Sequence, residues 1–332
     1  MTIVRRNPAA GRRYAGQRLL LLLVMGALVL TVASCSSPAS EQTTSAAGSG
    51  TTATGDSGRS IDIGNGRTLF MECRGVGRPT VILESGIHDS SEYWVNIQPN
   101  APAIGPDVFA GIAQHTKTCR YDRPGTLIPG QEAKITERST PVTNPRTIDQ
   151  ASADLDALIK AAGLEGPFLM VGHSFGGWLQ TYYTQTHPRD VVGLVLVDAF
   201  SARMPEFMGD KWTAYEKVLN SLGGNPLGSD PASEKYDVLA SAKLSLAAPG
   251  LPKDLPMAVM SKSEPFPLPA DLKGFTSADL ETAWTKVQDA LVELVPNTPH
   301  VIAQGSDHDI RVRDPDLVTS TVVLILERVP AR

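Results

Sequence analysis

Cysteine is scarce in this 332-residue chain, and so are residue patterns that hold metals or nucleotides. Three cysteines are too few to build a small domain on disulfides. No group of cysteines and histidines has metal-ligand spacing, and no G-x-x-x-x-G-K-S/T loop is present. The sequence therefore predicts no metal site and no cofactor.

Acidic residues outnumber basic residues over most of the chain. Five arginines precede residue 35, so the rest carries 25 basic against 35 acidic residues. A surface with this excess of negative charge repels phosphate backbones, and a nucleic-acid partner is therefore disfavoured. With 42% hydrophobic and 20% charged residues, the composition is that of a globular protein with a sizeable core.

The longest apolar run is too short for a permanent membrane helix. The 14 residues from Leu19 to Val32 would span about 21 Å as a helix, less than the roughly 30 Å of a bilayer core. The run follows the five arginines and ends in small residues before Cys35, a layout typical of a signal peptide over residues 1–34. Val32-Ala33-Ser34-Cys35 resembles a bacterial lipobox. This resemblance implies an exported lipoprotein, anchored through lipidated Cys35 on the outer side of the cytoplasmic membrane.

The composition changes again after Cys35. Residues 36–58 contain 19 Ser, Thr, Gly or Ala among 23 positions, so residues 35–59 are predicted to be a flexible linker behind the lipidated cysteine. No internal repeat follows, and residues 60–332 are predicted to form one folded domain.

Strand-like and helix-like segments alternate along this domain. Two short runs joined by Asn65-Gly66 predict an opening hairpin. The later strand-like runs are apolar on both faces, which indicates an α/β fold with a mostly parallel sheet. Residues 199–255 contain no strand, only helical segments around 207–222 and 233–246, and are predicted to form an inserted lid. The predicted strands are 60–65, 67–74, 79–85, 116–122, 167–172, 191–198, 256–261 and 300–305, and the predicted helices between them are 148–162, 175–186, 277–294 and 315–328.

One serine lies where a predicted strand turns directly into a predicted helix. Strand 167–172 leads into Gly172-His173-Ser174-Phe175-Gly176, a G-x-S-x-G pattern in the strand-turn-helix context that gives it meaning. Such a turn strains the serine backbone and has no room for side chains at the flanking glycines. Ser174 is therefore the candidate nucleophile, at a helix N-terminus that favours developing negative charge.

With this elbow, residues 60–332 resemble the α/β-hydrolase superfamily with a serine nucleophile. Asp122-Arg123-Pro124-Gly125 is similar to the D-R-x-G turn common in that superfamily, and the export signal and lid resemble secreted actinobacterial esterase-like members. The resemblance implies an eight-stranded, mostly parallel sheet with helices on both faces and a small helical lid. It also implies hydrolysis through a serine, a histidine and an acid.

The histidine and the acid follow the serine along the chain. His308 lies in Gly305-Ser306-Asp307-His308 after the last predicted strand, where the superfamily carries its base. Two carboxylates compete for the other role, which is to hold the tautomer of the histidine. Asp198 ends a strand and is short, whereas Glu264 follows the next strand at the more common location but lacks the usual G-x-x-D pattern. We favour Asp198 and keep Glu264 as the alternative.

Two further predictions rest on the resemblance. The backbone N–H groups of Ile87, in Ser85-Gly86-Ile87, and of Phe175 are the expected oxyanion hole. In the strand order of the superfamily, the strands that carry Cys73 and Cys119 are neighbours, and an exported protein could bridge these two cysteines by a disulfide.

The sequence thus predicts an exported serine hydrolase whose substrate is a small-molecule ester or lipid. Amidase, thioesterase and C–C bond hydrolase activity are compatible with the same residues, and a non-catalytic ligand-binding protein on the same fold is the alternative from another class. Nothing in the sequence predicts an oligomeric state.

Overall fold

The computed structural model of the chain describes residues 2–4, 58–95, 106–130, 133–221, 226–268 and 272–330. Lipidation at Cys35, the predicted cleavage site and the predicted linker up to residue 57 lie outside these residues. The linker was expected to extend to residue 59, but Arg59 already begins the first strand of the domain, where it pairs with Met71. From Arg59 onward, the described residues contribute eight strands to one sheet. They are β2 (Arg59–Gly64), β3 (Arg67–Arg74), β4 (Thr80–Glu84), β5 (Thr118–Tyr121), β8 (Phe168–His173), β9 (Val191–Val197), β10 (Met257–Lys262) and β11 (His300–Ala303).

The strand order in space is β11-β10-β9-β8-β4-β5-β3-β2. The strand β3 runs antiparallel to both of its neighbours, and the other pairs are parallel. A further short strand, β1 (Thr2–Val4), pairs in parallel with β11. This arrangement confirms the predicted α/β class with a mostly parallel sheet.

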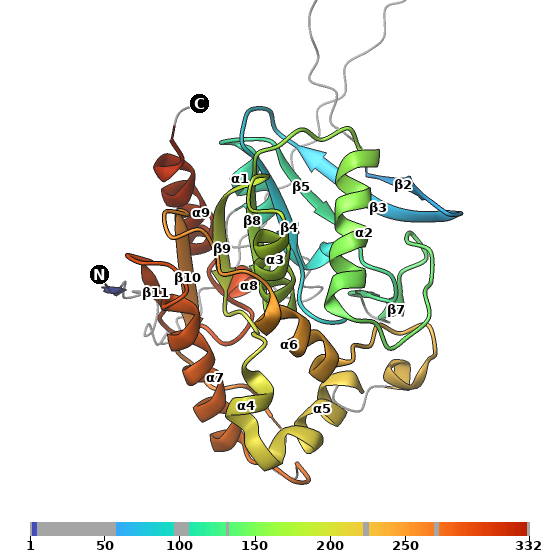
Figure 1. The fold of residues 1–332 in the computed structure, drawn as a ribbon, viewed down its shortest axis with the longest axis vertical. Helices are drawn as coiled ribbons and strands as arrows, with labels where there is room; N and C mark the ends of the chain where they lie inside the picture. Colours follow the sequence, from blue (N-terminus) through green and yellow to red (C-terminus); the bar gives the residue numbers. More distant parts are fainter. Residues whose placement is uncertain are drawn as a thin grey trace, which may run out of the picture. The chain divides into compact units, whose positions relative to one another are not determined.

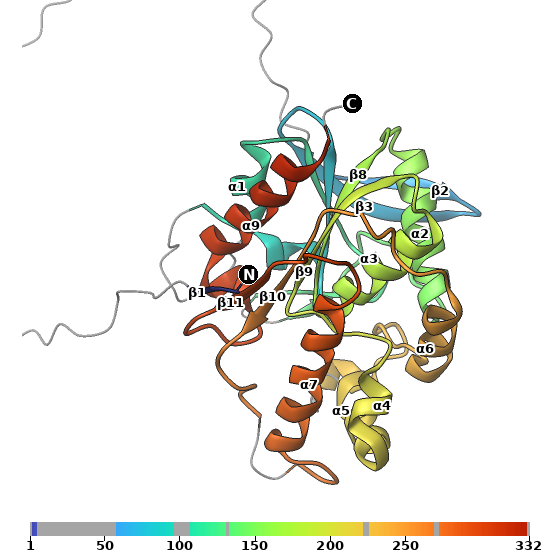
Figure 2. The ribbon, with the colours of Figure 1, turned by 60° about the vertical axis from the view of Figure 1, so that its left-hand side comes forward.

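Both faces of the sheet are buried because its central strands are apolar at consecutive positions, whose side chains point to opposite faces. On β8, Phe168 and Met170 pack into one core, whereas Leu169 and Val171 pack into the other. One face is covered by α2 (Ile148–Ala161), α3 (Phe175–Thr186) and α7 (Ser277–Val292), and the other by α1 (Val108–Ala113) and α9 (Pro315–Arg328). Figure 2 shows α1 and α9 on the side of the sheet opposite to α2 and α3. Strands covered on both sides explain why the sequence runs are apolar at consecutive positions.

Three helices interrupt the alternation between β9 and β10. They are α4 (Met204–Met208), α5 (Trp212–Asn220) and α6 (Val238–Ala247). Helix α4 lies beside α7 in the lower part of Figure 1, whereas α6 packs against α2. The expected helix over 207–222 is instead two helices, because Gly209 adopts a φ of 55° after α4. The expected segment from 233 begins only at Val238, where the side chain of Asp237 accepts a hydrogen bond from Ala240 N.

Smaller elements complete the described chain. A two-stranded sheet pairs β6 (Leu127–Ile128) with β7 (Lys134–Ile135). One helical turn, α8 (Ile310–Arg313), and the 3-10 turns η1 (Ser91–Trp94), η2 (Gly209–Lys211) and η4 (Pro226–Ser229) lie between the larger elements. No helix among the described residues has the length and apolar character needed to cross a membrane.

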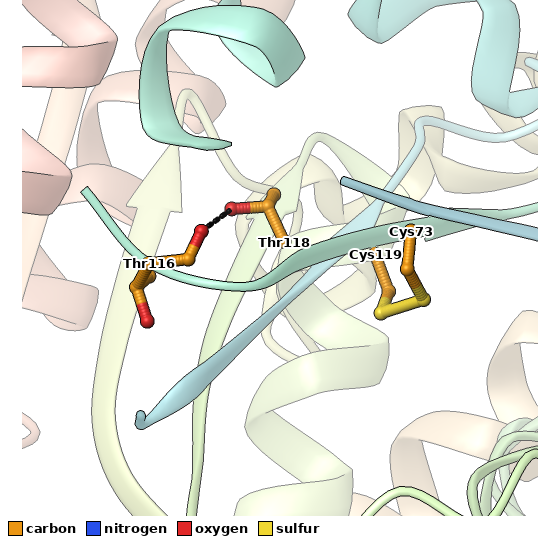
Figure 3. The surroundings of a disulfide bond; sticks show 4 residues. All are labelled: Cys73, Thr116, Thr118 and Cys119. Atoms are coloured by element: carbon orange, nitrogen blue, oxygen red, sulfur yellow. Dashed lines mark hydrogen bonds between the residues drawn. A yellow bond between two sulfur atoms is a disulfide. The ribbon is translucent and has the colours of Figure 1, made fainter. Parts of the chain in front are cut away.

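A disulfide joins β3 to β5. Cys73 and Cys119 are directly opposite in the antiparallel pair, and their sulfur atoms are bonded. Figure 3 shows this bond beside Thr118, whose hydroxyl donates to the carbonyl oxygen of Thr116. The strand neighbours are those that the superfamily resemblance implied.

Candidate active site

Ser174 occupies a strained turn between β8 and α3. Its φ of 52° lies in the left-handed region, which a residue with a side chain adopts only when its surroundings enforce it. Two close approaches require glycine here. A Cβ on Gly172 would lie 2.4 Å from the Gly176 carbonyl oxygen, and one on Gly176 would lie 2.4 Å from the Glu84 carbonyl oxygen. The Ser174 N–H donates to Val197 O, which ties the turn to β9.

His308 and Asp198 are joined directly. The Nδ1 atom of His308 lies 2.6 Å from Oδ2 of Asp198, a fully buried carboxylate at the end of β9. The other oxygen, Oδ1, accepts a hydrogen bond from the Lys262 N–H at 3.1 Å. Asp198 also has a positive φ of 42°, so two residues of this site lie in the left-handed region. An Nδ1–H held by a carboxylate leaves Nε2 of His308 as the proton acceptor.

Glu264, the alternative acid, forms no hydrogen bond with His308. Its side chain is exposed, and Oε1 accepts from Ser263 Oγ at 3.2 Å. The backbone N–H of Glu264 donates to Ser306 O, which fixes the loop after β10 beside the loop that carries His308. The structure therefore brings Asp198, and not Glu264, into contact with His308.

Ser174 and His308 open into one cavity of about 270 Å³, which Ile87 and Phe175 also line. Within the described part of the chain, the Ser174 hydroxyl has no hydrogen-bond partner, as is common for catalytic groups in the absence of substrate. Phe175 is the first residue of α3, where N–H groups lack a partner within the helix. The Ile87 N–H makes no hydrogen bond to any described residue. Two backbone donors thus border the cavity beside the serine.

A buried arginine supports the loop that carries His308. Arg311 on α8 donates to Nδ1 of His173 and to Oδ2 of Asp89 at 2.7 Å, and it forms an ion pair with Oδ1 of Asp309 at 3.1 Å. Burial and the nearby guanidinium keep the pKa of His173 well below its ordinary value, so its ring is neutral. Its Nε2 lies 2.9 Å from the carbonyl oxygen of His308 and donates to it. The serine elbow and the histidine loop are therefore connected through His173.

A second buried network holds the loop after β4. Arg123 donates to Ser85 O at 2.9 Å and to Gly86 O at 2.6 Å, and forms ion pairs with Glu84 and Glu234. Burial raises the pKa of Glu84 to about 7, against the opposing effect of Arg123. Arg123, in turn, lowers the pKa of Glu234 despite its burial. The hydrogen bonds from Arg123 thus hold in place the backbone that carries the Ile87 N–H.

The sequence between β4 and the C-terminal helix matches a known family. Residues 81–325 match the family described as "Alpha/beta hydrolase family". The chain belongs to the alpha/beta hydrolase family.

Individual relatives share little sequence with the chain. An uncharacterized protein of Schizosaccharomyces pombe is 22% identical over an alignment of 302 positions that covers 74% of this chain, and the chain spans about half (51%) of that relative. Lipase LipV of Mycobacterium tuberculosis is 29% identical over 116 residues, 35% of this chain and 41% of LipV. The structure of alpha/beta hydrolase domain-containing protein 10 from mouse is similar at a TM-score of 0.54 and 14% identity, over 82% of this chain and 100% of the mouse chain. This structural likeness shows the fold.

Several residues at the site of this α/β-hydrolase carry no recognisable signal in the sequence. Arg311, Asp89 and Asp309 are single charged residues in loops or a one-turn helix, where no periodic pattern marks them. The aromatic residues Phe266 and Trp284 flank the ring of His308, with ring centroids 4.9 and 5.1 Å away. Among the described residues, no group of three or more His, Cys, Asp or Glu side chains is arranged to hold a metal ion.

Proposed function

We propose that this protein is an extracytoplasmic serine hydrolase that cleaves carboxylic esters through an acyl-enzyme. Ser174 is the nucleophile, His308 the general base and acid, and Asp198 the carboxylate that orients the histidine. The observation that carries this proposal is the 2.6 Å hydrogen bond between His308 and Asp198 at a cavity that also contains the strained Ser174. Membership of the alpha/beta hydrolase family and the partial similarity to Lipase LipV support ester chemistry.

The reaction begins at the serine hydroxyl. Nε2 of His308 accepts the proton as Ser174 Oγ bonds to the ester carbonyl carbon. Asp198 stabilises the imidazolium that forms, because its oxygen already accepts from Nδ1. His308 then donates the proton to the leaving alcohol, and the C–O bond of the ester breaks. Water repeats the sequence on the acyl-enzyme and releases the acid.

The negative charge of the tetrahedral intermediate falls on the former carbonyl oxygen. The N–H groups of Ile87 and Phe175 are the donors that we assign to it, each of which is worth roughly 3 kcal/mol in such sites. The α3 N-terminus favours the same charge. Because Arg123 fixes the Ser85 and Gly86 carbonyl groups, the Ile87 donor is held in place before substrate binds.

The proposed location follows from the N-terminal sequence. Cleavage before Cys35 would remove β1, which leaves the eight strands from Arg59 onward as the sheet of the mature protein. The segment between Cys35 and the first strand at Arg59 would then tether the domain to the lipid anchor. Incorporation of a radiolabelled fatty acid into the full-length protein, and its loss in Cys35→Ala, tests this assignment.

Covalent labelling tests the nucleophile. The full-length protein is treated with a fluorophosphonate probe, and the modified peptide is identified by mass spectrometry. Labelling at Ser174 that is lost in Ser174→Ala and strongly reduced in His308→Ala is the expected result. A folded protein that stays unlabelled would instead favour a non-catalytic ligand-binding role.

A further inference from the structure

Five of the thirteen residues that line the cavity beside Ser174 are phenylalanine, tyrosine or tryptophan. The lid segment of residues 199–255 contributes two of these rings, and the region from β10 to α7 contributes two more. The aromatic residues that line the cavity are Phe175, Phe200, Tyr215, Phe266 and Trp284. Aromatic rings carry negative charge on their faces and attract cations, most strongly where water is excluded.

The charged groups that line the same cavity are acidic. Asp89 and Asp309 both line it, and both form an ion pair with one guanidinium, that of Arg311. One positive charge between two carboxylates leaves one net negative charge. Among the described residues that line the cavity there is no lysine or arginine, and the Arg311 side chain is fully buried behind it.

This negative charge lies close to the nucleophile. A Cβ placed on Gly86 would lie 2.9 Å from Oδ2 of Asp89 and 3.3 Å from Cβ of Ser174. The side chain of Asp89 is 23% exposed and that of Asp309 is 50% exposed, so a ligand can reach both. Asp89 contacts Arg311 through Oδ2, and Oδ1 accepts no hydrogen bond from any described residue.

We propose that this cavity selects ester substrates that carry a cationic group, such as a quaternary ammonium, a few ångströms from the scissile bond. The inference rests on the proposed hydrolase function and adds its substrate class. Aromatic rings supply the walls for the alkylammonium, and the carboxylates of Asp89 and Asp309 supply the countercharge. A cavity of about 270 Å³ admits only a small group of this kind.

A pair of isosteric substrates measures the selectivity. Acetylthiocholine and 3,3-dimethylbutyl thioacetate differ only in a charged nitrogen or a neutral carbon, and release of the thiol is followed with a chromogenic disulfide. We expect kcat/KM to be about tenfold higher for the cationic thioester. This preference should fall in Asp89→Asn and in Asp309→Asn. It should persist in Asp210→Asn, which removes an equal charge from an exposed position outside the cavity.

A binding measurement separates this proposal from the proposed function. Phenyltrimethylammonium and benzenesulfonate are titrated into the Ser174→Ala protein by calorimetry, which needs no catalysis. Binding of the cation alone, weakened in Asp309→Asn, supports the proposal even if no ester is turned over. Equal rates for the two thioesters, or binding of benzenesulfonate in preference to the cation, would overturn it. If Asp89→Asn fails to fold, the half-exposed Asp309→Asn still decides the outcome.

Discussion

Replacing Asp198 by asparagine should remove most of the turnover while the fold is retained. In the native protein, Oδ1 of Asp198 accepts from the Lys262 N–H at 3.1 Å, and Oδ2 faces Nδ1 of His308 at 2.6 Å. The amide oxygen of an asparagine is required at the Lys262 N–H, so its NH2 group must face His308. That group can only donate, and Nδ1 must then be unprotonated.

The consequence is a wrong tautomer of His308. Its proton moves to Nε2, which then cannot accept the proton of Ser174. A change of this kind lowers kcat by about 10⁴-fold in serine hydrolases with such a histidine, which corresponds to roughly 5 kcal/mol of transition-state stabilisation. KM should change little, because Asp198 is fully buried and does not line the cavity.

The assay is steady-state hydrolysis of p-nitrophenyl butyrate, with thermal unfolding of each variant to verify that the fold is retained. Glu264→Gln is the matched control, because Glu264 is exposed and bonds only to Ser263 through its side chain; its kcat should stay within about twofold of wild type. If Asp198→Asn kept a tenth of the activity, or if Glu264→Gln showed the large loss, the assignment of the acid would be refuted.

Three further outcomes follow from buried charges and from the disulfide. Arg311→Met leaves Asp89 without its partner and should lower the free energy of unfolding, measured by urea denaturation, by about 3 kcal/mol. The control Arg313→Met removes a half-exposed partner of Asp307 and should lower it by less than about 1 kcal/mol. Equal losses in the two variants would contradict the role of Arg311. Burial raises the pKa of Glu84 to about 7 from an ordinary value of 4.5, so the folded state retains a proton that the unfolded chain loses. The stability from this group is present at low pH and is lost as the pH rises from about 4.5 to about 7, and this part of the pH dependence should vanish in Glu84→Gln; an unchanged slope would count against the raised pKa. Reduction of the Cys73–Cys119 bond, which joins residues 46 apart, should lower stability by up to about 4 kcal/mol, and uptake of two alkyl groups without prior reduction would show that the bond is absent.

The order of the main strands along the chain could be predicted from the sequence because each of them is a short run of apolar or alternating residues between turn residues. Two alternating runs and six apolar runs correspond to the eight strands that join the large sheet from Arg59 onward, and the G-x-S-x-G pattern identified the elbow before α3. The short strands β1, β6 and β7 were not predicted. Helix α1 was missed, since its six residues are too few to show a helical period. The break at Gly209 was missed because nearby residues on both sides favour a helix.

The sequence favoured Asp198 as the acid but left Glu264 open as the alternative. Both residues follow strands that are adjacent in the sheet, β9 and β10, and chain order alone does not say which of two neighbouring loops reaches His308. The deciding fact is three-dimensional, since the turn after β9 directs Asp198 toward the histidine loop whereas the loop after β10 exposes Glu264. Arg311 and Asp89 were missed for the same reason, because they are 222 positions apart and meet only in the folded chain.

Different parts of the lid segment, residues 199–255, have different contacts with the site. Glu234, near its centre, is fully buried, accepts from Arg123 at 2.7 Å and accepts from the His88 N–H at 2.7 Å. Displacing it would leave the Arg123 charge buried without that partner, at a cost of several kcal/mol, and would loosen the loop that carries the Ile87 donor. Helix α5 instead contributes Tyr215 and Leu219 to the cavity wall. Of these two parts of the lid segment, α5 is therefore the one that borders a substrate bound in the cavity, whereas the segment around Glu234 supports the loop that carries the Ile87 donor.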